Sequence, residues 1–592
     1  MSLPPERDPR LIWTEADEPR SGRFGDVYFS AEDGLAETRA VFLEGCGLPG
    51  GWQDRAHYTI AELGFGTGLN IAAVLDLWQR TRTPGQRLSL FSVEGYPLAP
   101  DEARRALSRW SELAPATAAL LSGWPAPTPG FHRIDLPGFG ASLDLAVGPV
   151  ECALTQWTGR ADAWFLDGFS PATNPDMWSE DVMDAIAARS AADARIATFT
   201  VAGDVRRRLA DRSFVVEKKP GHGRKRQRLE ARRHGVPEPA PVLPRIAIVG
   251  AGIAGASVAR ALAAQGAGAV LFETVGAAPA ASGFPAALVT PRFDLGDAAV
   301  AALFAQALER AVALYRDIPG AVLAEGVVQR PGTERDAARF ARIADQPIWA
   351  PDAMRLDDQG DLVMRDAVTV APAAIRDPWL ASTPAADGRV ASIVPGRAGW
   401  ALRDAQGGTL AEADAVILCA GAGNAALLPG LALSPVRGQV DWSRHDPPVA
   451  TAWGGYVAPT PDGVLFGATH DRDQTSTEVR AADTRRNLET LATRFPDLAA
   501  AIDPAAVASR AAIRATTRDR LPVCGAVPDR PGLFVLGGLG SRGFCLAPLL
   551  ADHVVALTLE RPSPLPADIA ARVAPSRAAA RALVEPPASR ED

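Results

Sequence analysis

The sequence predicts an α/β protein with two nucleotide-binding domains, and three features of the chain lead to that prediction. An apolar strand, a glycine-rich turn and an amphipathic helix follow one another at residues 58–70, and the same pattern returns at residues 245–262. Between them, V-P-E-P-A-P-V-L-P (236–244) holds four prolines in nine residues, which can continue neither a helix nor a central strand. We therefore predict a first domain over residues 1–235, a linker over 236–244 and a second domain over 245–592.

The length and composition of the chain are those of a large soluble protein. Its 592 residues exceed what one core accommodates, and 47% of them are apolar while 22% are charged. The N-terminal M-S-L-P-P-E-R-D-P-R lacks the basic start and apolar core of a signal peptide, and no apolar run looks long enough to span a bilayer. We expect a cytoplasmic protein that does not bind a membrane.

The cysteines indicate neither a metal site nor a disulfide framework. Five of them are scattered along the sequence without a C-x-x-C pair, which argues against zinc and iron–sulfur clusters and suits a reducing compartment. We therefore expect no metal. A single reactive cysteine remains an alternative. The five are Cys46, Cys152, Cys419, Cys524 and Cys545.

Strand and helix patterns alternate along the first domain, which favours a parallel sheet with helices on both faces. The domain ends differently, because S-F-V-V-E-K-K-P, G-H-G and R-K-R-Q-R-L-E-A-R-R predict an antiparallel hairpin. A hairpin that closes a parallel sheet is typical of the class I methyltransferase fold. The expected strands are 58–63, 87–93, 162–167 and 194–200, and the expected helices are 69–79, 101–109, 176–191 and 203–211.

The first glycine-rich turn, E-L-G-F-G-T-G-L-N, predicts a nucleoside site. Gly64, Gly66 and Gly68 place no Cβ between the backbone and a ligand, and the next strand ends at Glu94, whose carboxylate can accept both hydroxyls of a ribose. The spacing G-x-G-x-G, in place of G-x-G-x-x-G, favours S-adenosylmethionine over NAD. A tight strand–helix turn beside a surface glutamate is the alternative.

A later strand of the same domain ends in A-W-F-L-D-G-F-S-P, which places Asp167 at the edge of the sheet that carries the glycine turn. Asp-Gly and Ser-Pro are ordinary turn signals, so Asp167 could merely end a strand. Many methyltransferases that act on amines place a polar–aromatic–proline motif at this position. Asp167 would then hold the N–H of the amine and Phe169 would form an apolar wall, with most of the catalytic gain coming from alignment.

Positive charge is concentrated at the end of the first domain. The net charge of −8 alone argues against a nucleic-acid partner, but Arg206 to Arg233 holds twelve Lys+Arg against three Asp+Glu, a local +9. A charged edge strand exposed to water would explain this run without a ligand. Beside a nucleoside-modifying site, however, we predict that it binds RNA. The candidate RNA-binding residues are Arg206, Arg207, Lys218, Lys219, Arg224, Lys225 and Arg226.

The second domain begins with a dinucleotide-binding pattern. A strand over 245–249 leads into Gly250, Gly252 and Gly255, a helix that ends at Gln265, and a strand over 269–272. Glu273 then follows 23 residues after Gly250, near the spacing expected of a ribose ligand. The motif by itself does not separate FAD from NAD.

Two later segments favour FAD. A-D-A-V-I-L-C-A-G-A-G includes Gly421, and G-L-F-V-L-G-G-L-G-S-R-G-F includes Gly538, Gly540 and Gly543 before a helix expected over 547–557. The N-terminus of that helix could stabilise a reduced flavin. Together the segments resemble the glycine and D-amino-acid oxidase superfamily. The resemblance implies FAD-binding segments at about 245–295, 410–425 and 510–560, interrupted by an α+β substrate domain.

Two arginines stand at motif positions of that superfamily. Oxidases of this class act on amines that carry a carboxylate, which arginine binds well. Arg514 stands where the carboxylate-binding arginine is often found, and Arg542 lies beside the flavin loop. Phosphate binding or a structural ion pair is the alternative for each. Arg437 and Gln439, in S-P-V-R-G-Q-V, are expected to be structural or adjacent to FAD, not catalytic.

The sequence as a whole resembles one family of bifunctional bacterial enzymes that make 5-methylaminomethyl-2-thiouridine at the wobble position of tRNA. The motifs V-Y-F-S, V-F-L-E-G, G-F-G-T-G-L-N, D-A-W-F-L-D-G-F-S-P-A-T-N-P-D-M-W and G-H-G-R-K-R carry the resemblance. It implies that the flavin half removes the carboxymethyl group from 5-carboxymethylaminomethyl-(2-thio)uridine. The other half would methylate the amine so uncovered, with Asp167 orienting or deprotonating its nitrogen.

Three positions depart from the pattern expected of that family: Pro149 replaces an aspartate, Cys46 an asparagine and Gln227 a glutamate. Two other functions therefore stay open. One is a fused oxidase and methyltransferase for a free amino acid or small amine. The other is a tRNA-binding flavoprotein whose methyltransferase half is inactive.

Overall fold

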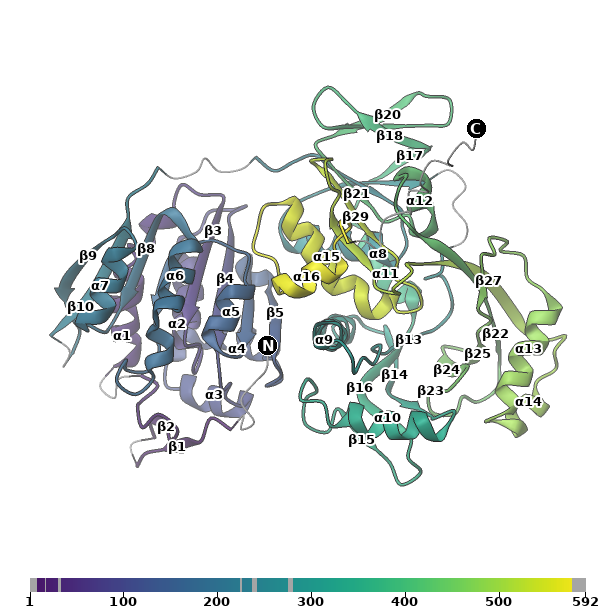
Figure 1. Ribbon diagram of the computed structural model, residues 1–592, viewed down its shortest axis with the longest axis horizontal. Coiled ribbons are helices and arrows are strands. Elements are labelled where there is room, and N and C mark those ends of the chain that lie inside the picture. Colours follow the sequence, from purple (N-terminus) through teal and green to yellow (C-terminus); the bar gives the residue numbers. More distant parts are fainter. Residues whose placement is uncertain are drawn as a thin grey trace, which may run out of the picture. The chain divides into compact units, whose positions relative to one another are not determined.

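The computed structural model describes residues 8–15, 17–29, 33–223, 226–236, 242–274 and 280–577. The chain divides into two compact units. The first comprises the chain up to Val242 together with Ala264–Gly266 and Arg561–Ala567, and the second comprises the remaining residues. In Figure 1 the chain up to Val242 is coloured from purple to blue and the chain after it from teal to yellow. Each unit has its own sheets and its own cores.

The first unit is built on an eight-stranded sheet of order β5-β6-β4-β3-β7-β8-β10-β9. The five strands from β6 to β8 in this order run parallel, while β5 and the hairpin β9–β10 are antiparallel to their neighbours. The chain order reverses at β3, where α/β sheets bind ligands. The sheet strands are β3 (His57–Leu63), β4 (Arg87–Glu94), β5 (Gly130–Leu136), β6 (Ala141–Val147), β7 (Ala161–Leu166), β8 (Ser190–Thr198), β9 (Phe214–Pro220) and β10 (Gln227–Arg233).

Helices cover both faces of this sheet (Figure 1). Ile60 belongs to one hydrophobic cluster and its neighbour Ala61 to another, because successive residues of a strand point to opposite faces. The predicted class I methyltransferase fold, with its closing hairpin, is confirmed. The remaining elements are β1 (Leu11–Trp13), β2 (Pro19–Ser21), α1 (Gly34–Thr38), α2 (Leu69–Thr81), α3 (Pro100–Leu107), α4 (Ala114–Ser122), α5 (Val150–Gln156), α6 (Glu180–Ala188) and α7 (Gly203–Asp211).

The single helix predicted over 176–191 is wrong. A short 3₁₀ turn covers Pro175–Trp178, and α6 begins only after Ser179, whose hydroxyl accepts the N–H of Val182 at 3.3 Å. This serine cap ends the turn and starts the helix. At the other end β8 already begins at Ser190, so that the strand expected from residue 194 is longer than predicted. Strands β5 and β6 were not predicted from the sequence.

The second unit contains a six-stranded sheet of order β17-β12-β11-β21-β29-β28. Its neighbours from β17 to β29 run parallel, so three predicted cofactor-binding segments, far apart in the sequence, meet in one sheet. The elements are β11 (Ile246–Val249), α8 (Ile253–Ala264), β12 (Val270–Thr274), β17 (Ala385–Val390), β21 (Ala415–Leu418), α12 (Asn424–Leu427), β28 (Val523–Ala526), β29 (Leu533–Gly537), α15 (Gly543–Thr558) and α16 (Ala567–Val573).

A ten-stranded sheet interrupts the cofactor-binding segments, as predicted for the substrate domain. Helix α13 packs on β22 and β25 of this sheet. A separate three-stranded sheet comprises β18 (Ser392–Pro395), β19 (Trp400–Arg403) and β20 (Thr409–Ala413). The large sheet comprises β13 (Ala287–Val289), β14 (Val322–Gln329), β15 (Met354–Leu356), β16 (Leu362–Val370), β22 (Ser434–Ser443), β23 (Thr451–Ala452), β24 (Tyr456–Thr460), β25 (Gly463–Gly467), β26 (Asp471–Arg472) and β27 (Ala508–Thr516), and the helices between its strands are α9 (Ala298–Arg316), α10 (Glu334–Ala344), α11 (Pro372–Leu380), α13 (Ala481–Ala492) and α14 (Pro496–Ala501).

Helix α15 starts four residues earlier than the predicted helix over 547–557, so that Pro548 lies inside it. Pro548 has no N–H with which to bond the carbonyl of Phe544, one turn before it. The buried hydroxyl of Tyr315, on α9, donates to that carbonyl at 2.7 Å instead. The first residue of the helix is Gly543, which belongs to the last glycine-rich loop.

Helix α9 is the one helix among the described residues that is long and apolar enough to cross a membrane. No such run was expected from the sequence. However, 61% of its most apolar window is buried inside the structure, and Arg310 in its centre forms an ion pair with the buried Asp552 of α15 at 2.8 Å. A core helix of a soluble protein has the same properties.

Candidate active sites

The first unit holds a cavity of about 1080 Å³ at the carboxyl ends of its central strands. Gly64, Gly66, Glu94, Asp167 and Phe169 all line it, so the structure brings these predicted site residues together. They follow or end β3, β4 and β7, which are neighbours in the sheet. Gly68 is not among the lining residues and instead lies at the N-terminal cap of α2.

The glycine turn is shaped by the close approach of β3 and β7. Gly64 has φ +93°, and a Cβ on it would lie 2.2 Å from the carbonyl oxygen of Asp167. A side chain at this position would separate the ends of the two strands. Gly68 has φ +81°, a left-handed conformation that turns the chain into α2.

The carboxylate of Glu94 is held by two backbone groups at the cavity wall. It accepts the N–H of Gly66 at 2.8 Å through one oxygen and the N–H of Tyr96 at 2.9 Å through the other. Burial raises the pKa of Glu94, and the backbone donors oppose that effect. Each oxygen keeps a further lone pair, so the carboxylate has room for two donors of a ligand.

The carboxylate of Asp167 is oriented by Asn70, which the sequence analysis missed. Asn70 lies in the first turn of α2 and donates to Asp167 at 2.7 Å. The amide oxygen of Asn70 accepts the hydroxyl of Thr38 at 2.8 Å, which fixes which end of the amide faces Asp167. Asn70 is the final residue of G-F-G-T-G-L-N, and that position could have identified it as a site residue. The first turn of the helix lies over the strand ends, where Asp167 is found.

Phe169 forms one wall of the cavity together with two aromatic residues from the N-terminal segment. Phe24 stacks on it with ring centroids 4.8 Å apart, and Tyr28 meets it edge-on at 5.5 Å. All three line the cavity. Neither Phe24 nor Tyr28 was identified as a site residue from the sequence, because nothing local to residues 24–28 connects them with residue 169.

Glu62 is a further missed carboxyl group, buried beneath the glycine turn. One of its oxygens accepts the hydroxyl of Ser92 at 2.5 Å, and the other has no hydrogen-bond partner among the described residues. Burial, together with the charges of Asp167 and Glu94, raises the pKa of Glu62 to about 8. Glu62 could have been identified from the sequence as an acid two residues before the first glycine of the turn.

The three unusual positions differ in their relation to the cavity. Pro149 lines it and caps the N-terminus of α5, so no side-chain acceptor is present at that position. Cys46 is fully buried, and its thiol contacts the carbonyl oxygen of Trp164 at 3.6 Å. Gln227 is exposed at the start of β10.

The basic residues lie on α7 and on the hairpin β9–β10. Arg206, Lys218 and Arg226 are exposed, whereas Arg207 is paired with Asp204, and Lys219 contacts Glu217 at 2.5 Å. Arg224 and Lys225 fall outside the described residues. At the hairpin turn, His222 lines the cavity, so the basic hairpin adjoins the site that contains Asp167.

The second unit holds a cavity of about 1100 Å³ between its two large sheets. Gly255 does not line it; inside α8, its Cβ would lie 1.9 Å from the carbonyl oxygen of Gly250, so only glycine lets the helix follow the turn so closely. A Cβ on Gly252, by contrast, would meet nothing nearer than 3.5 Å, which leaves that face of the turn open to a ligand. The predicted residues that line the cavity are Gly250, Gly252, Glu273, Gly421, Arg514, Gly538, Gly540, Arg542 and Gly543.

Two arginines face this cavity without a carboxylate partner among the described residues. Burial lowers the pKa of Arg514, on β27, and a half-buried tyrosine, Tyr456 on β24, lies close enough to oppose that effect. Burial also lowers the pKa of Arg542, which caps α15 and donates to the hydroxyl of Thr290. Tyr456 lines the cavity as well and was missed, because an isolated tyrosine in a strand gives no sequence signal.

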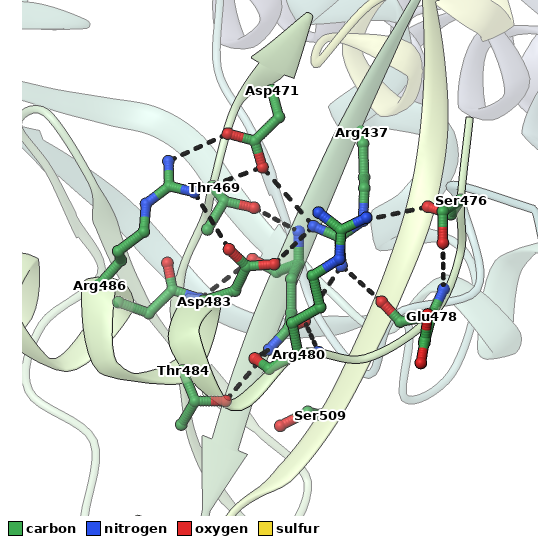
Figure 2. A network of polar contacts seen from close by, with 12 residues as sticks. Arg437, Thr469, Asp471, Ser476, Glu478, Arg480, Asp483, Thr484, Arg486 and Ser509 are labelled. Carbon is green, nitrogen blue, oxygen red and sulfur yellow. Dashed lines mark hydrogen bonds and ion pairs between the residues drawn. The ribbon is translucent and has the colours of Figure 1, made fainter. Parts of the chain in front are cut away.

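Arg437 and Gln439 are buried and are not among the residues that line the cavity. Figure 2 shows Arg437 within a network of polar contacts. Arg437 forms an ion pair with Asp483 of α13 at 2.6 Å and donates to the carbonyl oxygens of Ser476 and Glu478. Gln439 accepts the N–H of Arg480 at 2.9 Å. These bonds tie β22 to the chain that leads into α13, which fits the structural role expected of both residues.

Comparisons with known proteins agree with the architecture of both units. A family model described as S-adenosyl-L-methionine-dependent methyltransferase matches residues 111–234, and one described as FAD dependent oxidoreductase matches residues 245–557. A relative from Caulobacter sp. (strain K31) is 53% identical over 96% of this chain and 98% of its own length, and one from Maricaulis maris (strain MCS10) is 44% identical over 92% of each. Both are named tRNA 5-methylaminomethyl-2-thiouridine biosynthesis bifunctional protein MnmC. The crystal structure of glycine oxidase from Geobacillus kaustophilus is 26% identical over 54% of this chain and 95% of that chain, with a TM-score of 0.47.

The residues present suit the two cofactors that the family models name. In the first cavity, each oxygen of Glu94 keeps a free lone pair, as the donors of S-adenosylmethionine require. In the second, the open face of the Gly252 turn precedes the helix α8, as a bound pyrophosphate requires. Both predicted cofactors, S-adenosylmethionine and FAD, are thereby confirmed. The chain belongs to the family of bifunctional tRNA 5-methylaminomethyl-2-thiouridine biosynthesis proteins, with its methyltransferase half first and its FAD-dependent oxidoreductase half second.

Proposed function

We propose that this protein modifies the wobble uridine of tRNA in two successive reactions. The second unit, over 245–592, converts 5-carboxymethylaminomethyl-(2-thio)uridine to 5-aminomethyl-(2-thio)uridine. The first, over 1–235, methylates the new amine to 5-methylaminomethyl-(2-thio)uridine, and 236–244 links the two. The observation that carries the proposal is the presence of two cavities, one with an oriented carboxylate for an amine and one with two arginines, Arg514 and Arg542, that have no carboxylate partner among the described residues.

In the oxidation, Arg514 binds the carboxylate of the substrate arm through two parallel hydrogen bonds, assisted by the hydroxyl of Tyr456. FAD, which would be held by the turn at Gly250 and Gly252 and by Glu273, would supply the acceptor for two electrons. A hydride leaves the carbon between the nitrogen and the carboxylate, and the nitrogen loses its proton. Water then adds to the resulting C=N bond, and that carbon departs as glyoxylate, with oxygen as the final oxidant. Arg542 and the N-terminus of α15 would stabilise negative charge on a bound flavin.

In the methylation, S-adenosylmethionine supplies the methyl group from a positively charged sulfur. Asp167, fixed by Asn70, accepts an N–H of the primary amine and so directs the lone pair of the nitrogen toward the methyl carbon. Phe169 forms the apolar wall beside the reacting atoms. Glu94 accepts the hydroxyls of the ribose, and Gly64 and Gly66 leave room for the nucleoside.

The basic residues of α7 and the hairpin bind the tRNA backbone. His222 lines the methyltransferase cavity, so phosphates beside the target uridine would fall near the exposed Arg206, Lys218 and Arg226. Arg207 and Lys219 would contribute by exchanging their present carboxylate partners for phosphate. The reactions need no metal and no membrane, and we propose that the protein acts in the cytoplasm.

The experiment that tests this function is nucleoside analysis of tRNA from a strain that lacks the gene. We expect the carboxymethylaminomethyl form to accumulate and the methylaminomethyl form to return when the gene is restored. An unchanged nucleoside profile would refute the proposal. Turnover of glycine or sarcosine by the purified protein, with no activity on tRNA, would favour an enzyme for small amines.

A further inference from the structure

The oxidase cavity opens beside two arginines that the proposed reactions do not use. Arg472 lies on β26 and Arg520 in the loop between β27 and β28, and both are exposed. Neither guanidinium has a hydrogen bond or an ion pair with a described residue. His470, which lines the cavity, is near both of them and near Arg514.

The strand register places Arg472 on the same side of the sheet as Arg514. Arg472 and Arg514 both pair with Val436, from the two strands that flank β22. Residues paired across neighbouring strands point to the same face. Arg437, the next residue on β22, points to the other face, where it meets Asp483 and the network of Figure 2.

Two of the acidic neighbours of these arginines are bound by other arginines. Asp471, beside Arg472, accepts hydrogen bonds from Arg486 at 3.1 and 3.4 Å. Asp519, beside Arg520, forms an ion pair with Arg577 at 3.0 Å. Among the described residues, neither Asp471 nor Asp519 forms an ion pair with Arg472 or Arg520, and Asp473, which follows Arg472 in the sequence, forms none with either arginine.

The loop that carries Arg520 is held in place before any ligand binds. The carboxylate of Asp519 accepts the hydroxyl of Thr517 at 2.7 Å and the N–H of Leu521 at 3.0 Å, which closes the turn on itself. Arg292 donates to the carbonyl oxygens of Asp519 and Arg520 at 3.3 Å each. A ligand would thus find Arg520 on a fixed backbone, so little ordering would be required on binding.

The charge of this region also acts on His470. Partial burial and the guanidinium groups of Arg514, Arg472 and Arg520 lower the pKa of His470, whereas Asp471 opposes the effect only weakly. The mouth of the cavity thus has a positive potential. A single substrate carboxylate, bound inside by Arg514, would not need two further exposed arginines.

We propose that Arg472 and Arg520 bind phosphates of the single-stranded RNA that flanks the target uridine, and so form a tRNA contact of the oxidase unit's own. This inference rests on the proposed function. The contact would hold the anticodon strand while the modified base enters the cavity, independently of the basic hairpin of the first unit. Exposed arginines without partners suit phosphates, which they bind by two hydrogen bonds each.

The test compares the full-length variant Arg472→Gln/Arg520→Gln with a control, Arg397→Gln/Arg403→Gln. The control removes two exposed arginines from the three-stranded sheet, so the change in net charge is the same. The probes are tRNA that carries 5-carboxymethylaminomethyluridine and the corresponding free nucleoside, which has no phosphate. Oxidation and flavin absorbance are measured over a range of salt concentrations.

For the Arg472→Gln/Arg520→Gln variant, we expect the KM for tRNA to rise about tenfold with kcat unchanged, and the slope of log kcat/KM against log salt to fall by about 1.4, as for two lost phosphate contacts. Oxidation of the free nucleoside, flavin content and methylation of aminomethyl-tRNA should stay unchanged. Equal losses on tRNA and free nucleoside, equal losses of oxidation and methylation, or a KM and salt slope like those of the control would each overturn the inference. If the wild-type protein oxidises neither probe, the proposed function itself fails.

Discussion

The two cavities are nearly equal in volume but opposite in charge. The methyltransferase cavity is lined by the carboxylates of Asp26, Glu37, Glu94, Glu151, Asp167, Asp176 and Asp181, and no arginine or lysine is among its described lining residues. The oxidase cavity is lined by three arginines, Arg376, Arg514 and Arg542, and by a single carboxylate, Glu273. Both lie at the end of a parallel sheet beside a glycine turn.

The difference in charge corresponds to what each reaction handles. S-adenosylmethionine and an amine bring positive charge, which carboxylates stabilise, whereas the FAD phosphates, a reduced flavin and a substrate carboxylate bring negative charge. The same type of sheet can therefore serve either reaction. What distinguishes the two sites is the charge of the side chains placed around the glycine turn, and each of the following predictions changes that charge or its placement.

The largest effect is expected from Asp167→Ala. Loss of the acceptor removes the alignment of the amine, so methylation should fall by about 10²- to 10⁴-fold while oxidation continues. Mass spectrometry of tRNA nucleosides should then detect the aminomethyl form. Asp176→Ala is the matched control, because Asp176 is an exposed carboxylate of the same cavity. Normal methylation by Asp167→Ala would contradict the role given to Asp167.

Arg514→Met should impair the other reaction, the oxidation. Without the guanidinium the substrate carboxylate loses two charge-assisted hydrogen bonds, worth about 2–4 kcal/mol, so kcat/KM for oxidation should fall by roughly 10²-fold or more. Stopped-flow reduction of the flavin measures it. Methylation of aminomethyl-tRNA and the flavin content should not change. A comparable loss in Arg376→Met would mean that charge in the cavity, and not the position of Arg514, matters.

Glu62→Gln should change how stability depends on pH. The pKa of Glu62 is about 8 in the folded protein and near 4.5 when exposed, so the native state binds the extra proton between these values. Its contribution to stability is therefore present below pH 4.5 and is lost as the pH rises toward 8. Relative to the wild type, Glu62→Gln should gain on the order of a few kcal/mol between pH 5 and pH 8.

Hydrogen exchange of β3 amides in the absence of cofactor, at pH 5 and pH 8, measures that gain. Glu151→Gln, which removes an exposed carboxyl group from the rim of the same cavity, serves as the control. If Glu62→Gln and the control respond alike to pH, then Glu62 is not the group that takes up the proton.

Asn70→Ala should have the smallest effect. It leaves the carboxylate of Asp167 in place but removes the 2.7 Å hydrogen bond that orients it, which is worth about 1–2 kcal/mol. We expect the kcat of methylation to fall about tenfold with KM for S-adenosylmethionine unchanged. Thr38→Val, one step further from Asp167, should lose less than Asn70→Ala. A larger loss in Thr38→Val would show that the chain of hydrogen bonds does not act through Asn70.

Some features could be predicted because a short stretch of sequence is enough to indicate each of them. These are the glycine turns, Glu94, Asp167 and the parallel sheets. The hydrophobic period and the turn residues act locally, and carboxyl ends of parallel strands always meet at one edge. The helix predicted over 176–191 failed for an equally local reason, since the capping role of Ser179 went unrecognised.

The residues that the sequence did not reveal depend on contacts between distant parts of the chain. Phe24 and Tyr28 become part of the site only because they pack on Phe169, and Tyr456 only because β24 lies near Arg514. The start of α15 was predicted wrongly because Pro548 lies inside the helix. The carbonyl that Pro548 cannot bond accepts the hydroxyl of Tyr315, more than 200 residues earlier in the chain. Such pairings depend on the fold and have no local pattern.

The position of β29 has a consequence for the making of the protein. The oxidase sheet is complete only when Leu533–Gly537 pairs with β21, whereas the methyltransferase sheet is complete once β10 has emerged at Arg233, much earlier in the chain. Domains fold as units from the N-terminus during synthesis. On the ribosome, the catalyst of the second reaction therefore matures first. A prematurely terminated chain would be a methyltransferase that depends on full-length molecules for its substrate.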